Sequence, residues 1–89
     1  MGRYRVLIKP SAVKEIEAIG RKKDRQRIVG RIKRLADDPR PADCQKLSGR
    51  DLYRVRQGNF RIVYSIEDDR LIAIVVKVGH RRDVYRSRS

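Results

Sequence analysis

The sequence of 89 residues has few of the side chains that form metal, redox or membrane sites. It contains one cysteine, Cys44, one histidine, His80, one phenylalanine and no tryptophan. A single cysteine excludes an internal disulfide and a zinc site built on several thiolates. No apolar run approaches the roughly 18–20 residues needed to cross a bilayer. The first residues also lack the apolar stretch of a signal peptide, so we expect a cytoplasmic protein.

Acidic residues are scarce as well. The chain has 24 Lys and Arg residues against 11 Asp and Glu, a formal net charge of +13, and 17 of the basic residues are arginine. Such a charge opposes compaction through self-repulsion and therefore indicates a polyanionic partner. Arginine is the side chain best shaped to bind phosphate bidentately. A helix that binds a membrane surface would carry Trp or Phe on its apolar side, so the composition favours nucleic acid over membrane.

The N-terminal half predicts one strand followed by two helices. Residues 4–8 are a short β-rich run closed by a proline, and Ser11 is the expected N-cap of a helix that stops at Gly20. A second helix is expected from Asp24. Its apolar residues recur at helical spacing and form one stripe, namely Ile28, Val29, Ile32, Leu35 and Ala36. Aspartates and prolines then end this helix and open a loop that runs to about Ser48.

The C-terminal half changes to the period of a strand. Strands are expected at 52–56, 60–66 and 71–78, with a two-residue turn at Gly58-Asn59 and with Gly79 ending the last strand. The sequence therefore predicts an α+β domain spanning residues 1–89. Its elements are a strand, two helices and a three-stranded antiparallel meander, with the helices packed on one face of the sheet.

The predicted hairpin places three arginines on one sheet face. With Gly58 and Asn59 as the turn, Arg56 lies opposite Arg61 and Arg54 opposite Val63. The residues that alternate with them face the helices, namely Tyr53, Val55, Ile62 and Tyr64. Like charges directly opposite each other repel by up to roughly 1 kcal/mol, so this cluster predicts an oxyanion site, most simply a phosphate site. The alternative is a polar face that serves only solubility, and a one-residue bulge at the turn would change the pairing.

Four segments together resemble RelE-type toxins of bacterial and archaeal type II toxin–antitoxin pairs. They are KLSG at 46–49, LYRVR at 52–56, FRIVY at 60–64 and VGHRRDVY at 78–85. The resemblance covers nearly the whole chain, including the order of the elements. It implies a microbial-ribonuclease-like fold and an enzyme that cuts mRNA in the ribosomal A site without a metal or other cofactor. In that reaction the 2′-hydroxyl of the messenger attacks the adjacent phosphate.

The resemblance also implies roles for individual residues. The catalytic set it implies is Arg54, Arg56, Arg61, Arg81 and Tyr85. The arginines would neutralise charge on the phosphorane, and Tyr85 would orient a base or take the 2′-hydroxyl proton. Arginine stands at 54 and 56 where relatives often have lysine, which favours an electrostatic role there over proton transfer. The RNA-binding set comprises Lys46, Arg31, Arg34, His80 and Arg82.

Each of these assignments has a simpler alternative. The basic side of the second helix, which carries Arg31 and Arg34, suits ribosomal RNA but would also serve as a solvated helix surface. His80 is an acid or base of the reaction, a role that histidine side chains take near neutral pH, or a solvated residue beside a turn. Tyr85 is a catalytic or base-stacking residue, or an aromatic anchor for the chain end.

The partners that the resemblance implies are a cognate antitoxin protein, the ribosome with its A-site mRNA, and operator DNA through the antitoxin complex. Two other functions remain open. One is a ParE-like inhibitor of DNA gyrase with the same fold, and the other is a basic protein that binds RNA or the ribosome without catalysis. The joint presence of Arg61, Arg81 and Tyr85 favours the nuclease.

Overall fold

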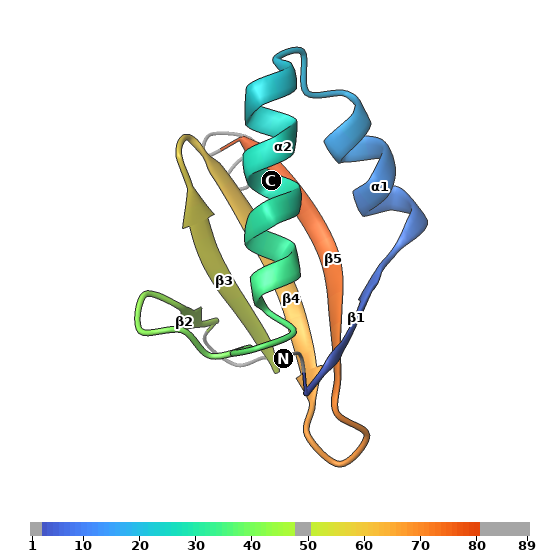
Figure 1. The fold of residues 1–89 in the computed structure, drawn as a ribbon, viewed down its shortest axis with the longest axis vertical. Coiled ribbons are helices and arrows are strands. Elements are labelled where there is room, and N and C mark those ends of the chain that lie inside the picture. The colour runs from blue at the N-terminus through green and yellow to red at the C-terminus, as the bar shows by residue number, and fades with distance from the viewer. Residues whose placement is uncertain (1–2, 48–50, 81–89) are drawn as a thin grey trace.

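The computed structural model describes residues 3–47 and 51–80, which form two helices and five strands. In chain order these are β1 (Arg5–Ile8), α1 (Pro10–Glu17), α2 (Lys22–Arg34), β2 (Gln45–Lys46), β3 (Leu52–Gln57), β4 (Phe60–Glu67) and β5 (Ile72–His80). Both helices lie on the same side of the sheet (Figure 1). This is the α+β architecture expected from the sequence, and neither helix lies on the other face of the sheet.

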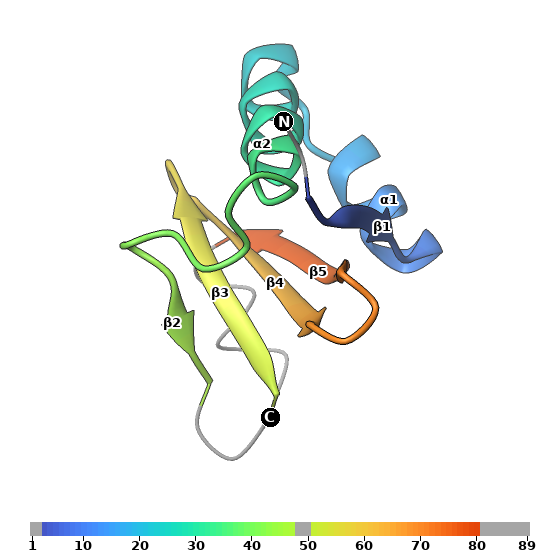
Figure 2. The same cartoon turned by 60° about the horizontal axis from the view of Figure 1, so that its bottom comes forward.

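The strands form one sheet in the order β1-β5-β4-β3-β2. The meander of β3, β4 and β5 is antiparallel, as predicted, whereas β1 pairs in parallel with β5. Parallel strands need a crossover connection, and here α1 and α2 lie on that connection. The first strand therefore forms one edge of the sheet, beside the last strand of the chain (Figure 2).

The core lies between the two helices and one face of the sheet. It contains Ala12, Ile16, Ile19, Ile28, Ile32, Leu35, Val55, Ile62, Tyr64, Val75 and Val78. The predicted apolar stripe of α2 is confirmed, because Ile28, Ile32 and Leu35 are each at most 2% exposed. Burying one such side chain stabilises a fold by about 1.5–3 kcal/mol. These contacts determine which sheet face the helices cover.

Both helices begin earlier than predicted. Ser11 is not the N-cap of α1, because the helix starts at Pro10 and its N-cap is Lys9, whose side chain makes no capping hydrogen bond. Proline suits the first helical position, since its φ is already helical and its missing N–H would have no partner there. The second helix starts at Lys22 and places Asp24 in its first turn, where a carboxylate interacts favourably with the helix dipole.

Two strand predictions also need correction. The expected loop after α2 contains the short strand β2, and β5 continues through Gly79 to His80 instead of ending before the glycine. In both cases pairing with a neighbouring strand makes the segment a strand, because Gln45 pairs with Arg54 on β3 and Gly79 pairs with Arg61 on β4. Such long-range pairing outweighs the local preference of a segment.

The register of the β3–β4 hairpin is the predicted one. Gln57 pairs with Phe60, and the pairs continue without interruption to Leu52 and Ser65. Gly58 has φ of +60°, the left-handed conformation that such a turn needs and that glycine adopts without a Cβ clash. The irregularity in the sheet lies elsewhere, between β4 and β5 at Val63/Tyr64. The arginine pairing derived from the turn is therefore confirmed.

Candidate functional site

Three arginines share the sheet face that the helices leave uncovered, and we call this group the arginine face (Arg54, Arg56 and Arg61). Arg56 on β3 lies directly opposite Arg61 on β4, and Arg54 lies opposite Val63. Directly paired residues have their side chains on the same face of a sheet, and neighbours along a strand alternate. The core residue Val55 therefore faces the helices, while the arginines on either side of it face away.

The members of the arginine face differ in burial. Arg61 is only 1% exposed, Arg56 is exposed and Arg54 is half-buried. A buried cation is screened by water less than an exposed one, so Arg61 contributes the least screened positive charge to this face, while the exposed Arg56 is the member open to direct contact. An anion bound beside Arg56 would offset the repulsion between these two cations.

The edge strand β2 extends this face. Gln45 pairs with Arg54, and Nη2 of Arg54 donates a hydrogen bond to Oε1 of Gln45. A hollow of about 430 Å³ lies between β3 and the segment that leads into β2, lined by Ala42, Asp43, Cys44, Gln45, Arg54 and Arg56. Sequence reasoning missed Gln45, because a two-residue strand carries no pattern of its own.

The other basic residues predicted to bind RNA lie elsewhere. Lys46 pairs with Tyr53 and so lies on the helix side of the sheet. Arg31 and Arg34 belong to α2, which covers that same side. The side chain of Arg31 is 16% exposed and is joined through Nη2 to Oδ2 of Asp43, whereas Arg34 is exposed. The structure therefore separates these three residues from the arginine face.

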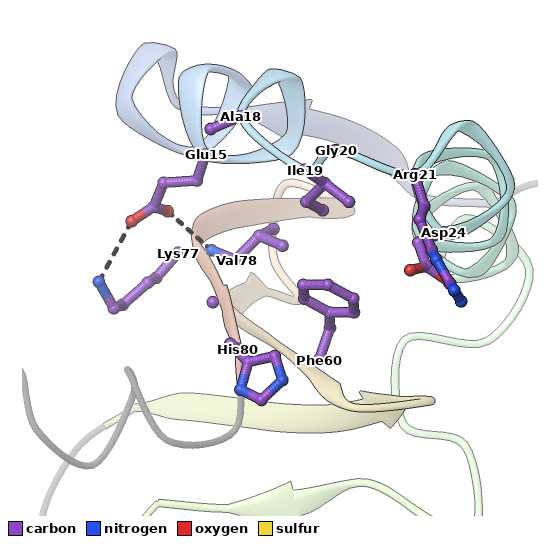
Figure 3. Close-up of a pocket in the computed structure, with 11 residues that line it drawn as sticks. Glu15, Ala18, Ile19, Gly20, Arg21, Asp24, Phe60, Lys77, Val78 and His80 are labelled. Atoms are coloured by element: carbon purple, nitrogen blue, oxygen red, sulfur yellow. Dashed lines mark hydrogen bonds and ion pairs between the residues drawn. The ribbon is translucent and has the colours of Figure 1, made fainter.

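His80 also lies on the helix side. It pairs with Phe60, and the two rings meet edge to face with 5.5 Å between their centroids. Figure 3 shows both residues at a hollow of about 460 Å³ between the sheet end and the α1–α2 connection. Because successive strand residues point to opposite faces, Gly79 occupies the position beside Arg61. His80 therefore lies on the opposite face of the sheet from the arginine face.

Glu15 occupies the rim of the same hollow and completes the edge of β5. Its carboxylate accepts a hydrogen bond from the backbone N–H of Val78 at 2.8 Å and one from Nζ of Lys77 at 3.2 Å (Figure 3). β1 pairs only with residues 72–75 of β5. At Val78 the edge of β5 has no partner in β1, and the carboxylate of Glu15 accepts the hydrogen bond from the backbone N–H instead.

Comparison with known proteins identifies the family. Residues 6–85 match the family model described as ParE toxin of the type II toxin–antitoxin system parDE. A curated RelE-like toxin protein of Escherichia coli is 33% identical over 87 residues, covering 93% of this chain and 90% of its own. The chain belongs to the RelE/ParE superfamily and is a RelE-type toxin.

Solved structures of RelE toxins share its fold. The archaeal RelE–RelB complex from Pyrococcus horikoshii matches with a TM-score of 0.80 and 30% identity, over 89% of this chain and 96% of the other. The isolated Escherichia coli RelE toxin matches with a TM-score of 0.75 and 26% identity, over 94% and 93% of the two chains. The predicted RelE-like fold is confirmed, and the chain is a toxin of a type II toxin–antitoxin system.

Three predicted site residues of this toxin lie outside the described residues. They are Arg81, Arg82 and Tyr85. Their roles remain predictions from the family resemblance. Of the ten predicted site residues, the structure therefore brings together Arg54, Arg56 and Arg61.

The segment beside the hollow is anchored at its start. The buried hydroxyl of Tyr64 donates to the backbone carbonyl of Pro39 at 2.6 Å, and burial is the main factor that raises the pKa of Tyr64. The guanidinium of Arg40 donates to both oxygens of Asp68, at 3.0 and 2.8 Å, and lies over the ring of Tyr53, 5.2 Å from its centroid. These contacts hold the chain between α2 and β2 against the sheet.

Residues 3–47 and 51–80 contain no group of three His, Cys, Asp or Glu side chains placed to hold a metal ion. In the same ranges, neither helix of the toxin is long and apolar enough to cross a membrane.

Proposed function

We propose that this toxin is a ribosome-dependent endoribonuclease that cuts mRNA in the A site and so inhibits translation. The observation that carries the proposal is the pairing of Arg56 with Arg61, beside Arg54, on the sheet face that the helices leave uncovered. The similarity to RelE toxins supports the same function. A cluster of like charges costs stability unless an anion binds between them, and the RNA backbone supplies such anions.

In the proposed reaction the 2′-hydroxyl of one nucleotide attacks the phosphate that follows it. The bond from phosphorus to the 5′-oxygen of the next nucleotide breaks, leaving a 2′,3′-cyclic phosphate, or a 3′-phosphate after hydrolysis, and a 5′-hydroxyl. Negative charge builds on the phosphorane, where Arg61 and Arg56 stabilise it. Because guanidinium groups do not release protons at neutral pH, another group takes the 2′-hydroxyl proton, and a proton must also be delivered to the leaving 5′-oxygen, from solvent in this scheme. The family resemblance gives Tyr85 either the first of these roles or the orientation of a base.

The proposed partners are polyanions and an inhibitor. The net charge of +13 suits the ribosome. Solved relatives are complexes of RelE with RelB, including the intact Escherichia coli RelBE toxin–antitoxin complex. By analogy this toxin binds a cognate antitoxin in the cytoplasm, and the complex binds operator DNA.

The test is 5′-end mapping of translated mRNA after a brief induction of the toxin, with and without an inhibitor of translation initiation. We expect new ends inside codons that disappear when initiation is blocked. Arg61→Ala should reduce cleavage by roughly 10²–10³, since it removes a cation that stabilises the transition state. Co-sedimentation of Arg61→Ala with ribosomes should change much less than cleavage. Tyr85→Phe tests the proton-transfer role in the same assay.

Arg70→Ala is the matched control, because Arg70 is exposed in the β4–β5 turn and outside the arginine face. It should cleave like the wild type. Equal losses of ribosome binding and cleavage in Arg61→Ala would contradict the transition-state role. Intact message together with normal growth would indicate a protein that binds RNA without cutting it.

A second candidate is inhibition of DNA gyrase, because the matching family model is the one described as ParE toxin. It predicts growth arrest with intact message and loss of supercoiling by purified gyrase when the toxin is added. Cleaved message and unaffected supercoiling would exclude it.

A further inference from the structure

The hollow beside the arginine face has two chemically different walls. One wall is β3, which carries the cationic residues Arg54 and Arg56. The other is the segment that leads into and includes β2, which carries the acidic Asp43 and the amide residue Gln45. A phosphate alone would be attracted by one wall and repelled by the other. A ligand that carries an anion at one end and hydrogen-bonding groups at the other end fits both walls.

Both polar side chains of the second wall are held in place. Oε1 of Gln45 accepts a hydrogen bond from Arg54, and the NH2 group of the same amide supplies the donors for a ligand. Oδ2 of Asp43 accepts a hydrogen bond from Arg31, which reaches it from α2. A carboxylate acceptor in the turn before β2 and an amide donor on β2 thus lie two residues apart in the chain.

A nucleotide has the required distribution of charge and hydrogen-bonding groups. Its phosphate would contact Arg56 and its base would contact Asp43 and Gln45. The volume of about 430 Å³ lies within the range of sites that take small molecules. Carboxylates accept hydrogen bonds from exocyclic amino groups of bases, and amides pair with bases in two-point fashion. Uracil has no amino group. Its single donor, N3–H, lies between two carbonyl oxygens, and both of them repel the carboxylate of Asp43.

We propose that this hollow binds the base next to the cleaved phosphate, and that Asp43 and Gln45 select a base with an exocyclic amino group over uracil. The inference rests on the proposed ribonuclease activity and adds the side chains that choose where the message is cut. Arg31 is a positioning residue in this arrangement, because it holds the carboxylate of Asp43 from the helix side.

The experiment compares the base composition around mapped cut sites for the wild type, Asp43→Asn and Gln45→Ala. For the wild type we expect uracil to be depleted roughly tenfold at one position beside the cut, the discrimination of one good base contact. Asp43→Asn replaces an obligate acceptor with a side chain that also donates, so uracil should recover to within about twofold of the other bases. Gln45→Ala, at an exposed edge position, should weaken the preference without affecting the fold.

Asp69→Asn is the matched control, since Asp69 is exposed in the β4–β5 turn, and it should keep the wild-type composition. Thermal unfolding of each purified variant confirms that it is folded. Cleavage by the wild type with no base preference beside the cut would overturn the inference and leave the nuclease intact. A preference that both variants keep would overturn it as well. Absence of cleavage by the folded wild type would overturn the nuclease and, with it, the inference.

Discussion

The carboxylate of Asp68 joins three segments that are far apart in the sequence. The hydroxyl of Tyr4 donates to it at 2.7 Å, and Arg40 donates to both of its oxygens. The hydrogen bonds from Arg40, and after them the one from Tyr4, lower the pKa of Asp68 to about 2. Single side chains thus connect the residue before β1, the chain after α2 and the β4–β5 turn at one end of the sheet.

The lowered pKa of Asp68 predicts how stability depends on pH. Since the folded value lies below the ordinary 3.8, the contribution of Asp68 is fully present above about pH 4 and is lost as the pH falls towards 2. Asp68→Asn should lower the free energy of unfolding at pH 6 and flatten its fall between pH 4 and 2. Urea unfolding at a series of pH values measures this, with Asp69→Asn as control. An unchanged acid slope in Asp68→Asn would contradict it.

Among the elements, α2 and the β3–β4 hairpin hold the two sides of the sheet in place. Each contains a glycine, but the two glycines differ. Gly30 lies in the interior of α2 and a Cβ there would meet nothing within 4 Å, whereas Gly58 has a positive φ in the hairpin turn. The glycine in α2 is not required by the backbone there. The hairpin turn does require Gly58, and the turn sets the register that aligns Arg56 with Arg61.

We therefore expect opposite effects of one substitution at two sites. Gly30→Ala should raise the free energy of unfolding by roughly 0.5–1 kcal/mol, because alanine has the higher helix propensity. Gly58→Ala should lower it by roughly 1 kcal/mol, because a Cβ is strained at positive φ. Urea denaturation of both variants checks the pair. A loss of stability in Gly30→Ala would mean that the helix surface there packs more closely than the structure shows.

For the whole molecule, positive charge lies on both sides of the sheet. The arginine face lies on one side, and the exposed cations of α2, such as Arg27 and Arg34, lie on the other. A chain with a net charge of +13 can therefore contact two stretches of phosphate at once. In the proposed function the arginine face contacts the message, while α2 contacts ribosomal RNA.

The salt dependence of ribosome binding tests whether α2 contacts ribosomal RNA. Replacing Arg27 and Arg34 with glutamine should weaken ribosome binding and reduce the slope of log affinity against log salt by roughly one to two, since each lost phosphate contact removes about 0.7–0.9. The positions of the mRNA cuts should stay the same. Arg70→Gln serves as the control, and an unchanged slope in the double variant would show that the basic side of α2 is only a solvated surface.

The sequence by itself determined the β3–β4 hairpin and the pairing of arginines across it. A turn of Gly58 and Asn59 between alternating strands has one register, and that register alone places Arg56 opposite Arg61. The apolar stripe of α2 was predictable for the same reason, because local periodicity states which face is buried. The family was also predictable, since its motifs lie at matching spacing along nearly the whole chain.

Only the tertiary structure decided what surrounds the arginines. The strand β2 forms because β3 offers it a partner, and this pairing brings Gln45 to Arg54. The extension of β5 along β4 places Gly79 beside Arg61 and turns His80 to the opposite side of the sheet. Pairing with a distant segment decides whether β2 forms and how far β5 extends, and for these two segments no local pattern in the sequence carries that information.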